Sequence, residues 1–327
     1  MFKYEIPPCI TNSEGGIRGV GVELELTDLK LSELAAVVIQ CFGGRSIVRS
    51  EFEIWIEDTE FGRFRLEYDS NYLKQSAAEE VTSDFDGVAK GVFRTILKNV
   101  SAVEIVTPPI AINQLYRLEA LVTQLRMSGA KGTRNQAFRA LGLHFNPEVT
   151  ALEAQTVLAT LKAFLCLYGW LAEHERIDLA RRVSPYIQPF PVDYVRLVVD
   201  SRYNPPIDLI IEDYIKYNPS RNRPLDMLPL FSFMAPEQVN ESINTALVSA
   251  RPTYHYRLPN SEVDDESWSL EKAWKGWVEV ERLAADKIRL DKVARLYLST
   301  LERSNFSWRS DWRDQLTTMM SISTEMD

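Results

Sequence analysis

The stretch GVGVELEL, residues 19–26, is the clearest fold signal in the chain. Its strict alternation predicts a β-strand over residues 17–27, because successive side chains of a strand point to opposite faces of the sheet. One face is aliphatic, and the other carries Gly19, Gly21, Glu23 and Glu25. Two adjacent carboxylates repel each other and glycines leave open space beside them, so a hard divalent cation such as Mg²⁺ would suit this face. The alternative is a solvent-exposed strand that carries two charges.

Four further segments alternate in the same way, namely residues 63–69, 102–107, 140–146 and 251–258. Each has an apolar face and an opposite face rich in charged or polar groups. The main polar positions are Arg63, Arg65, Glu67, Asp69, Glu104, His144, Asn146, Arg251, His255 and Arg257. If these strands share one sheet, that sheet has a buried side and a charged, cupped side. Such a face suits phosphoryl chemistry, in which carboxylates hold metal ions and arginines bind the phosphates.

The remaining pattern predicts an α+β fold in which helices pack on a curved antiparallel sheet with a polar concave face. Residues 51–57 and 63–69 flank the turn DTEFG and predict a hairpin. Helical periodicity covers residues 28–42, 113–127, 152–182, 207–217, 237–247 and 268–301. No change in composition marks a linker. We therefore expect one domain over residues 1–327, helical at about 265–303 and ending in a polar tail at 304–327.

Composition narrows the classes of function. The 327 residues include 37 Lys and Arg against 46 Asp and Glu, and this net charge of -9 argues against a general nucleic-acid binder. Three scattered cysteines argue against a disulfide scaffold and fit a reducing compartment. The N-terminus lacks a secretory pattern, and the most apolar stretch, residues 156–172, is shorter than the roughly 20 residues that span a bilayer. We expect a cytoplasmic protein with no membrane and no nucleic-acid partner.

At these residues the sequence resembles the amidoligase family, a branch of the carboxylate–amine ligases related to glutamine synthetase and glutamate–cysteine ligase. The similar segments follow the family's order and cover most of the chain. They are GVELEL at 21–26, FRLEYDSNYLK at 64–74, VEIVTPPI at 103–110, GLHFNPEV at 142–149, ARRVSPYIQPFP around Arg182, LDMLPLF at 225–231 and YHYRLPNSEVD at 254–264.

The resemblance implies a glutamine synthetase-like catalytic fold that binds ATP with Mg²⁺, or with Mn²⁺, on the concave face. It also implies amide formation: a carboxylate attacks the γ-phosphate of ATP, and an amine attacks the resulting acyl phosphate. The substrates would be a small-molecule or peptide carboxylate and an amine, and an ammonia-supplying or amide-processing enzyme is a further expected partner. By position, the metal ligands would be Glu23, Glu25, Glu104, His144 and Asp69.

The resemblance also assigns roles around the nucleotide. Arg257, Glu104 and His144 would be the catalytic residues, and Arg257, Arg251, Arg182 and His144 would contact the nucleotide. Arg182 lies near a predicted helix end, where the helix dipole alone can explain a cation. His255, between two tyrosines, can equally be a structural histidine.

Two positions depart from the family pattern. Asn146 replaces the second histidine of the Gly-x-His-x-His motif, and His255 stands where relatives often have glutamate. The alternative function is therefore a non-catalytic member of the fold that acts as a binding or interaction protein. A metal-dependent hydrolase or phosphotransferase on the same face is a third interpretation.

Overall fold

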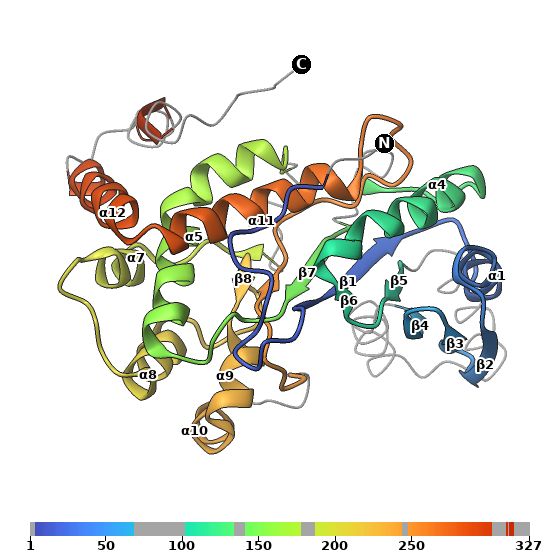
Figure 1. Cartoon of the computed structure of the whole chain (residues 1–327), viewed down its shortest axis with the longest axis horizontal. Helices are drawn as coiled ribbons and strands as arrows, with labels where there is room; N and C mark the ends of the chain where they lie inside the picture. Colours follow the sequence, from blue (N-terminus) through green and yellow to red (C-terminus); the bar gives the residue numbers. More distant parts are fainter. Residues whose placement is uncertain are drawn as a thin grey trace, which may run out of the picture. The chain divides into compact units, whose positions relative to one another are not determined.

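The computed structural model describes residues 4–68, 102–133, 141–177, 187–243, 248–302, 312 and 314–316. It is a mixed α/β structure with a large antiparallel sheet that is not closed into a barrel and is packed by helices (Figure 1). The chain divides into two compact units. Unit 1 comprises residues 1–4, 19–146 and 259–272, and unit 2 comprises residues 5–18, 147–258 and 273–327.

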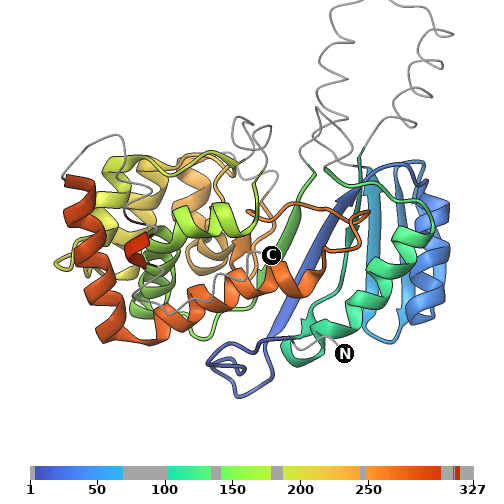
Figure 2. The same cartoon turned by 90° about the horizontal axis from the view of Figure 1, so that it is seen from above.

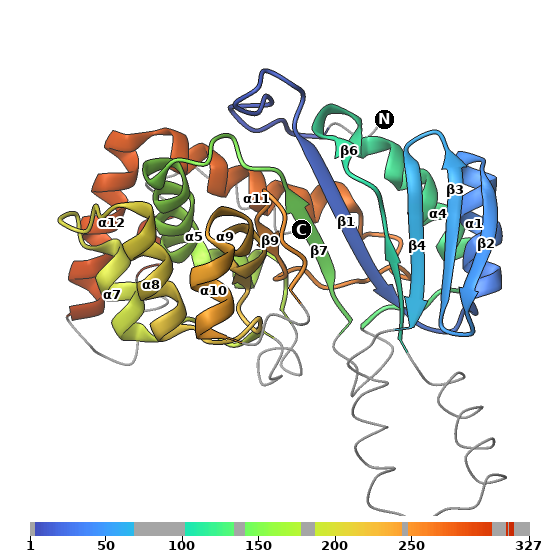
Figure 3. The ribbon, with the colours of Figure 1, turned by 90° about the horizontal axis from the view of Figure 1, so that it is seen from below.

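Unit 1 is built on strands in the order β2-β3-β4-β5-β1-β7, and β6 also pairs with β1. The strands are β1 (Gly19–Leu26), β2 (Arg45–Ser50), β3 (Glu53–Thr59), β4 (Gly62–Tyr68), β5 (Val103–Val106), β6 (Ile110–Ala111) and β7 (Leu143–Pro147). The pairs from β2 across to β1 are antiparallel, and Figure 3 shows β1, β4, β3 and β2 with their helices behind them. The predicted strands at 17–27, 63–69, 102–107 and 140–146 are confirmed as β1, β4, β5 and β7.

Helices cover one face of the unit 1 sheet and create its apolar core. They are α1 (Leu31–Phe42), the 3-10 helix η1 (Ile112–Leu118) and α4 (Glu119–Met127). In Figure 2, α1 and α4 lie along the same side of the strands. The even-numbered residues of β1, from Val20 to Leu26, are buried there. The ring of Phe42 in α1 stacks on that of Phe64 in β4 with centroids 5.4 Å apart, and it meets the ring of Phe61 edge-on at 5.3 Å. The opposite, odd-numbered face of β1 is free to carry glutamates.

Unit 2 is mainly helical. Its elements are α5 (Ala154–His174), α7 (Val192–Val199), α8 (Ile207–Tyr217), β8 (Leu225–Asp226), α9 (Leu228–Met234), α10 (Pro236–Ser242), β9 (His255–Tyr256), α11 (Leu270–Ala285), whose first turn belongs to unit 1, and α12 (Lys287–Glu302). Helix α5 has the length and composition of a membrane-crossing helix, but 67% of its most apolar window is buried inside the structure. That burial fits the core helix that the sequence predicts.

The predicted strand at 251–258 is wrong in its length, because the regular strand is limited to His255–Tyr256, which pairs with β8, and Thr253 forms only an isolated bridge with Glu148. Pro252 has no N–H to donate, and the N–H of Thr253 turns back to the carbonyl of Arg251. The expected polar face is also not a solvated one. His255 is 2% and Arg257 9% exposed, so both are buried, like the neighbouring Tyr254 and Tyr256.

Candidate functional site

A row of glutamates crosses four neighbouring strands of unit 1. Glu25 on β1 faces Glu104 on β5, Glu104 faces Glu67 on β4, and Glu67 faces Glu53 on β3. Like charges directly opposite each other destabilise a sheet. Four carboxylates in register therefore have a cost that the fold accepts, and such a cost is typical of a site that serves a ligand.

The position of Glu67 in this row changes its acidity. Burial raises the pKa of Glu67, and the neighbouring charge of Glu53 adds to the rise, whereas Arg65 and a hydrogen bond with Glu104 oppose it. Arg65 lies 3.3 Å from Glu67 Oε1. The carboxyl group of Glu67 therefore holds a proton more readily than an ordinary glutamate does.

At one end of the row, three side chains form a cluster with metal-ligand chemistry. Oxygen or nitrogen atoms of Glu25, Glu104 and His144 all lie within 4.8 Å of one another. The backbone N–H of Gly142 donates to Glu25 Oε2 over 2.6 Å, which fixes the orientation of that carboxylate. His144 Nε2 is 3.8 Å from this Oε1. The donor set of two carboxylates and one imidazole fits a divalent cation.

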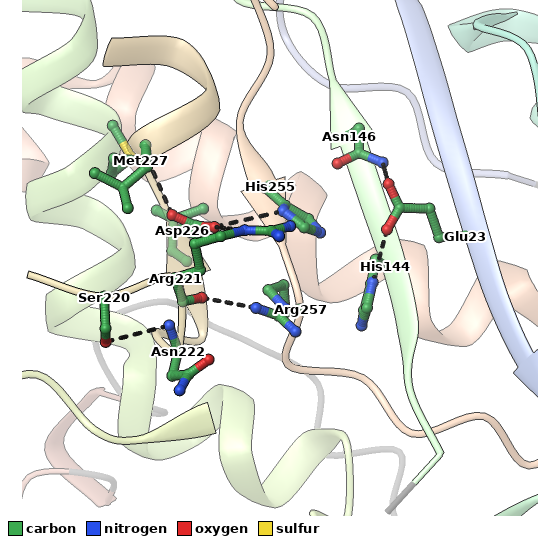
Figure 4. A network of polar contacts seen from close by, with 12 residues as sticks. Glu23, His144, Asn146, Ser220, Arg221, Asn222, Asp226, Met227, His255 and Arg257 are labelled. Atoms are coloured by element: carbon green, nitrogen blue, oxygen red, sulfur yellow. Dashed lines mark hydrogen bonds and ion pairs between the residues drawn. The ribbon is translucent and has the colours of Figure 1, made fainter. Parts of the chain in front are cut away.

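Glu23 contacts His144 from the other side (Figure 4). Its Oε2 lies 2.9 Å from His144 Nδ1, and its Oε1 accepts a 2.8 Å hydrogen bond from the side-chain amide of Asn146. A carboxylate on one imidazole nitrogen sets the ring's orientation and directs the other nitrogen towards a metal. Glu23 is thus placed to position His144, and Asn146 holds Glu23.

The space expected above the glycines of β1 is occupied. A Cβ built on Gly21 would lie 3.4 Å from the Cβ of Asn146, and one on Gly19 would lie 2.9 Å from the Cβ of Pro109. The prediction of an open cation pocket beside these glycines is therefore wrong. The glycines instead let β7 and the Pro108–Pro109 segment approach β1 closely, and the acidic cluster lies further along the strand.

A second polar group lies within unit 2 and is also drawn in Figure 4. Arg257 Nη1 donates to the carbonyl of Arg221 over 2.7 Å, which brings the two residues together. Asp226 is fully buried, with Oδ2 at 3.8 Å from Arg221 Nε and 3.7 Å from His255 Nδ1. This group thus brings two arginines and a buried carboxylate together, and guanidinium groups are the side chains best suited to bind phosphate.

The other predicted residues are less informative. Arg251 lies in unit 2 outside any strand, and its backbone N–H donates to the carbonyl of Pro229 over 3.1 Å. Asp69 and Arg182 lie outside the described residues. The structure thus gathers Glu25, Glu104 and His144 and shows Glu23 beside His144.

Sequence reasoning gave no role to Glu53, Arg221 or Asp226. Counting outward from the DTEFG turn pairs Glu53 with Glu67, so hairpin register could have found the first of these. Asp226 lies within the LDMLPLF segment, which was noted as a family motif without a role. Arg221 carries no pattern of its own, and its place follows from the tertiary fold.

Comparison with known protein families decides the chain's relationship. A family profile described as "putative amidoligase enzyme" matches residues 17–279, which is most of the chain. The chain belongs to this amidoligase family. Membership indicates an enzyme of the ligase type, and the matched range includes every described residue of both polar groups. Searches among curated proteins and among solved structures found no match.

Proposed function

We propose that this amidoligase is an ATP-dependent carboxylate–amine ligase. The observation that carries the proposal is the cluster of Glu25, Glu104 and His144, whose donor atoms lie within 4.8 Å of one another beside a row of like charges. Family membership supports the ligase class. We also infer that its sheet is of the glutamine synthetase type, with the glutamate row on the concave face.

In this proposal Glu25, Glu104 and His144 would hold Mg²⁺ or Mn²⁺. The metal would neutralise phosphate charge during transfer. Glu23 acts as a positioning residue, since it accepts from His144 Nδ1 and leaves Nε2 towards Glu25. In unit 2, Arg257 and Arg221 would bind the phosphates of the nucleotide through their guanidinium groups.

The reaction needs no nucleophilic side chain. The substrate carboxylate attacks the γ-phosphate of ATP, which releases ADP and leaves an acyl phosphate. The amine then attacks the acyl carbon, so that an amide forms and inorganic phosphate leaves. The residues contribute positioning and electrostatic stabilisation. The substrates would be a small-molecule or peptide carboxylate and an amine. A partner enzyme would supply ammonia as one such amine, and the reaction would take place in the cytoplasm.

The test is Mg²⁺-dependent turnover of ATP by the full chain with pooled carboxylates and amines, read as ADP formation and as amide in the products. Glu104→Gln should reduce turnover at least a hundredfold while thermal unfolding stays cooperative. Glu57→Gln is the matched control, because Glu57 lies on β3 beside Arg45 and Arg63 and away from the cluster.

Wild-type turnover in Glu104→Gln would refute the metal assignment. ATP turnover without amide would favour a hydrolase or phosphotransferase. The departures at Asn146 and His255 support one second candidate, a non-catalytic binding protein. That candidate predicts no Mg²⁺-dependent stabilisation by ATP, whereas a ligand at 100 times its Kd stabilises by about 2.7 kcal/mol.

A further inference from the structure

Unit 2 contains a cavity of about 580 Å³ that has no part in the proposed ligase chemistry. It is bordered by the N-terminal segment around Pro8, by α5, by the loop that follows α7, and by the junction of α11 and α12. Cavities of roughly 300–1,000 Å³ hold metabolite-sized ligands. None of its lining residues belongs to the glutamate row or to the Arg221–Arg257 group.

Lys162, in the middle of α5, contributes the decisive polar group. Lys162 lines the cavity, and only 7% of the residue is exposed to solvent. Within the described part of the chain, its ammonium makes one hydrogen bond, to the carbonyl of Asp200 over 3.3 Å. An ammonium has three N–H donors, and a buried charge is costly unless it is paired. Lys162 therefore has donors to offer a ligand.

The other charges that the described residues place on the wall cancel one another in number. Arg18 and Glu281 satisfy each other, with Nη1 to Oε2 at 2.7 Å and Nη2 to Oε1 at 2.6 Å. On α12, Lys287 and Asp291 contribute one charge of each sign. Among the described residues, three cations and two carboxylates line the cavity, so they leave one positive charge, and Lys162 is the buried cation that lacks a paired carboxylate at hydrogen-bond distance.

We propose that this cavity binds a small organic monocarboxylate, whose carboxylate pairs with the ammonium of Lys162. The apolar remainder of the ligand would pack against Leu158, Ala284 and Leu290. A single negative charge matches the single excess positive charge. This inference stands apart from the proposed function, because none of its residues is assigned to metal, nucleotide or phosphate.

The protonation state of Lys162 should make the affinity for a carboxylate depend on pH. Burial lowers the pKa of Lys162, and the charges that face it are Asp200 and Asp291 together with the Cys166 thiol, whose own pKa is raised by burial to about 12. The ammonium is present below the lysine's pKa and is lost as the pH rises through it. Affinity for a carboxylate should therefore fall at alkaline pH.

Calorimetry and thermal unfolding of the full chain, without ATP or metal, test the proposal with paired probes. Benzoate is compared with benzamide, and glutamate with glutamine. Each ligand is added up to about 20 mM, so that binding with a millimolar Kd is still detected. At least one carboxylate should bind and raise the Tm while its amide does not. Lys162→Met should weaken that binding at least tenfold, and Lys292→Met on the exposed side of α12 should leave it unchanged.

A second variant keeps the test decisive if Lys162→Met does not fold. Ala159→Phe on α5 fills the cavity without removing a charge and should abolish binding. Equal binding of acid and amide, undiminished binding by both variants, or no binding by any probe would overturn the proposal. Tighter binding of inorganic phosphate than of every carboxylate would overturn the choice of ligand class. Because no readout involves ATP, failure here would leave the ligase proposal standing.

Discussion

The two units bury charge in different ways. In unit 2, Arg18 is fully buried, and each of its three side-chain nitrogens donates to an acceptor: Glu281 accepts twice, the carbonyl of Glu148 accepts at 2.7 Å and that of Cys9 at 2.6 Å. In unit 1, Glu25, Glu104 and Glu67 face one another across β1, β5 and β4. A satisfied pair of opposite charges serves the structure, whereas like charges that face each other destabilise the sheet. The pattern of pairing, more than burial itself, separates structural from functional charge.

The largest effect is expected from breaking the unit 2 pair. Glu281→Gln leaves Arg18 buried without a countercharge and should lower the free energy of unfolding by about 3–5 kcal/mol. Chemical denaturation measures this. The double variant Arg18→Met/Glu281→Gln should recover part of the loss, because no uncompensated charge remains. A single variant as stable as the wild type would show that the pair is not structural.

A smaller effect of the opposite sign is expected in unit 1. Without metal, Glu104→Gln should raise the free energy of unfolding by about 0.5–1 kcal/mol, because it removes one charge from between two others. The new amide can also donate a hydrogen bond to the carboxyl group of Glu67. Added Mg²⁺ should stabilise the wild type and leave this variant unchanged. If the variant were less stable than the metal-free wild type, the row would be structural.

The smallest effect concerns Glu119, a buried carboxyl of unit 1 that is well supplied with donors. It accepts from Tyr4 Oη at 2.6 Å and from the N–H of Glu271 at 3.0 Å, yet burial still raises its pKa above the ordinary 4.5. The stability it contributes is thus complete below pH 4.5 and is lost as the pH rises through the folded-state pKa. Denaturation at several pH values should show Glu119→Gln losing this dependence. Parallel curves for variant and wild type would contradict the assignment.

Much of unit 1 could be predicted from sequence because its signals are local. Alternation in GVGVELEL sets which side chains of β1 face the helices, and the hairpin turn sets the register of β3 and β4. Edge strand β2 was missed because RSIVRS is mostly exposed and lacks a buried face. Local pattern therefore gives the strands that bury a face, and it misses those that only complete an edge.

The candidate site was predictable in its members more than in their roles. Glu25, Glu104 and His144 follow from strand faces and family position, but the turn of Glu23 towards His144 and Asn146 depends on how closely β7 approaches β1. The region around His255 was harder, since Pro252 and the turn at Thr253 replace a regular strand. The close approach of two strands and the break at a proline do not change the alternation of polar and apolar residues in the sequence. The roles that depend on them can therefore be assigned only from the three-dimensional structure.

The close fit between Gly21 and Asn146 makes these two positions interdependent. A methyl group on residue 21 would just touch the asparagine, and any bulkier substituent must push the amide away. Because that amide holds Glu23, and Glu23 holds the imidazole of His144, the disturbance would reach the ring nitrogen nearest Glu25. Returning histidine to position 146 would meet the same obstacle from the opposite direction. Any attempt to rebuild the two-histidine motif must therefore redesign the glycine strand together with it.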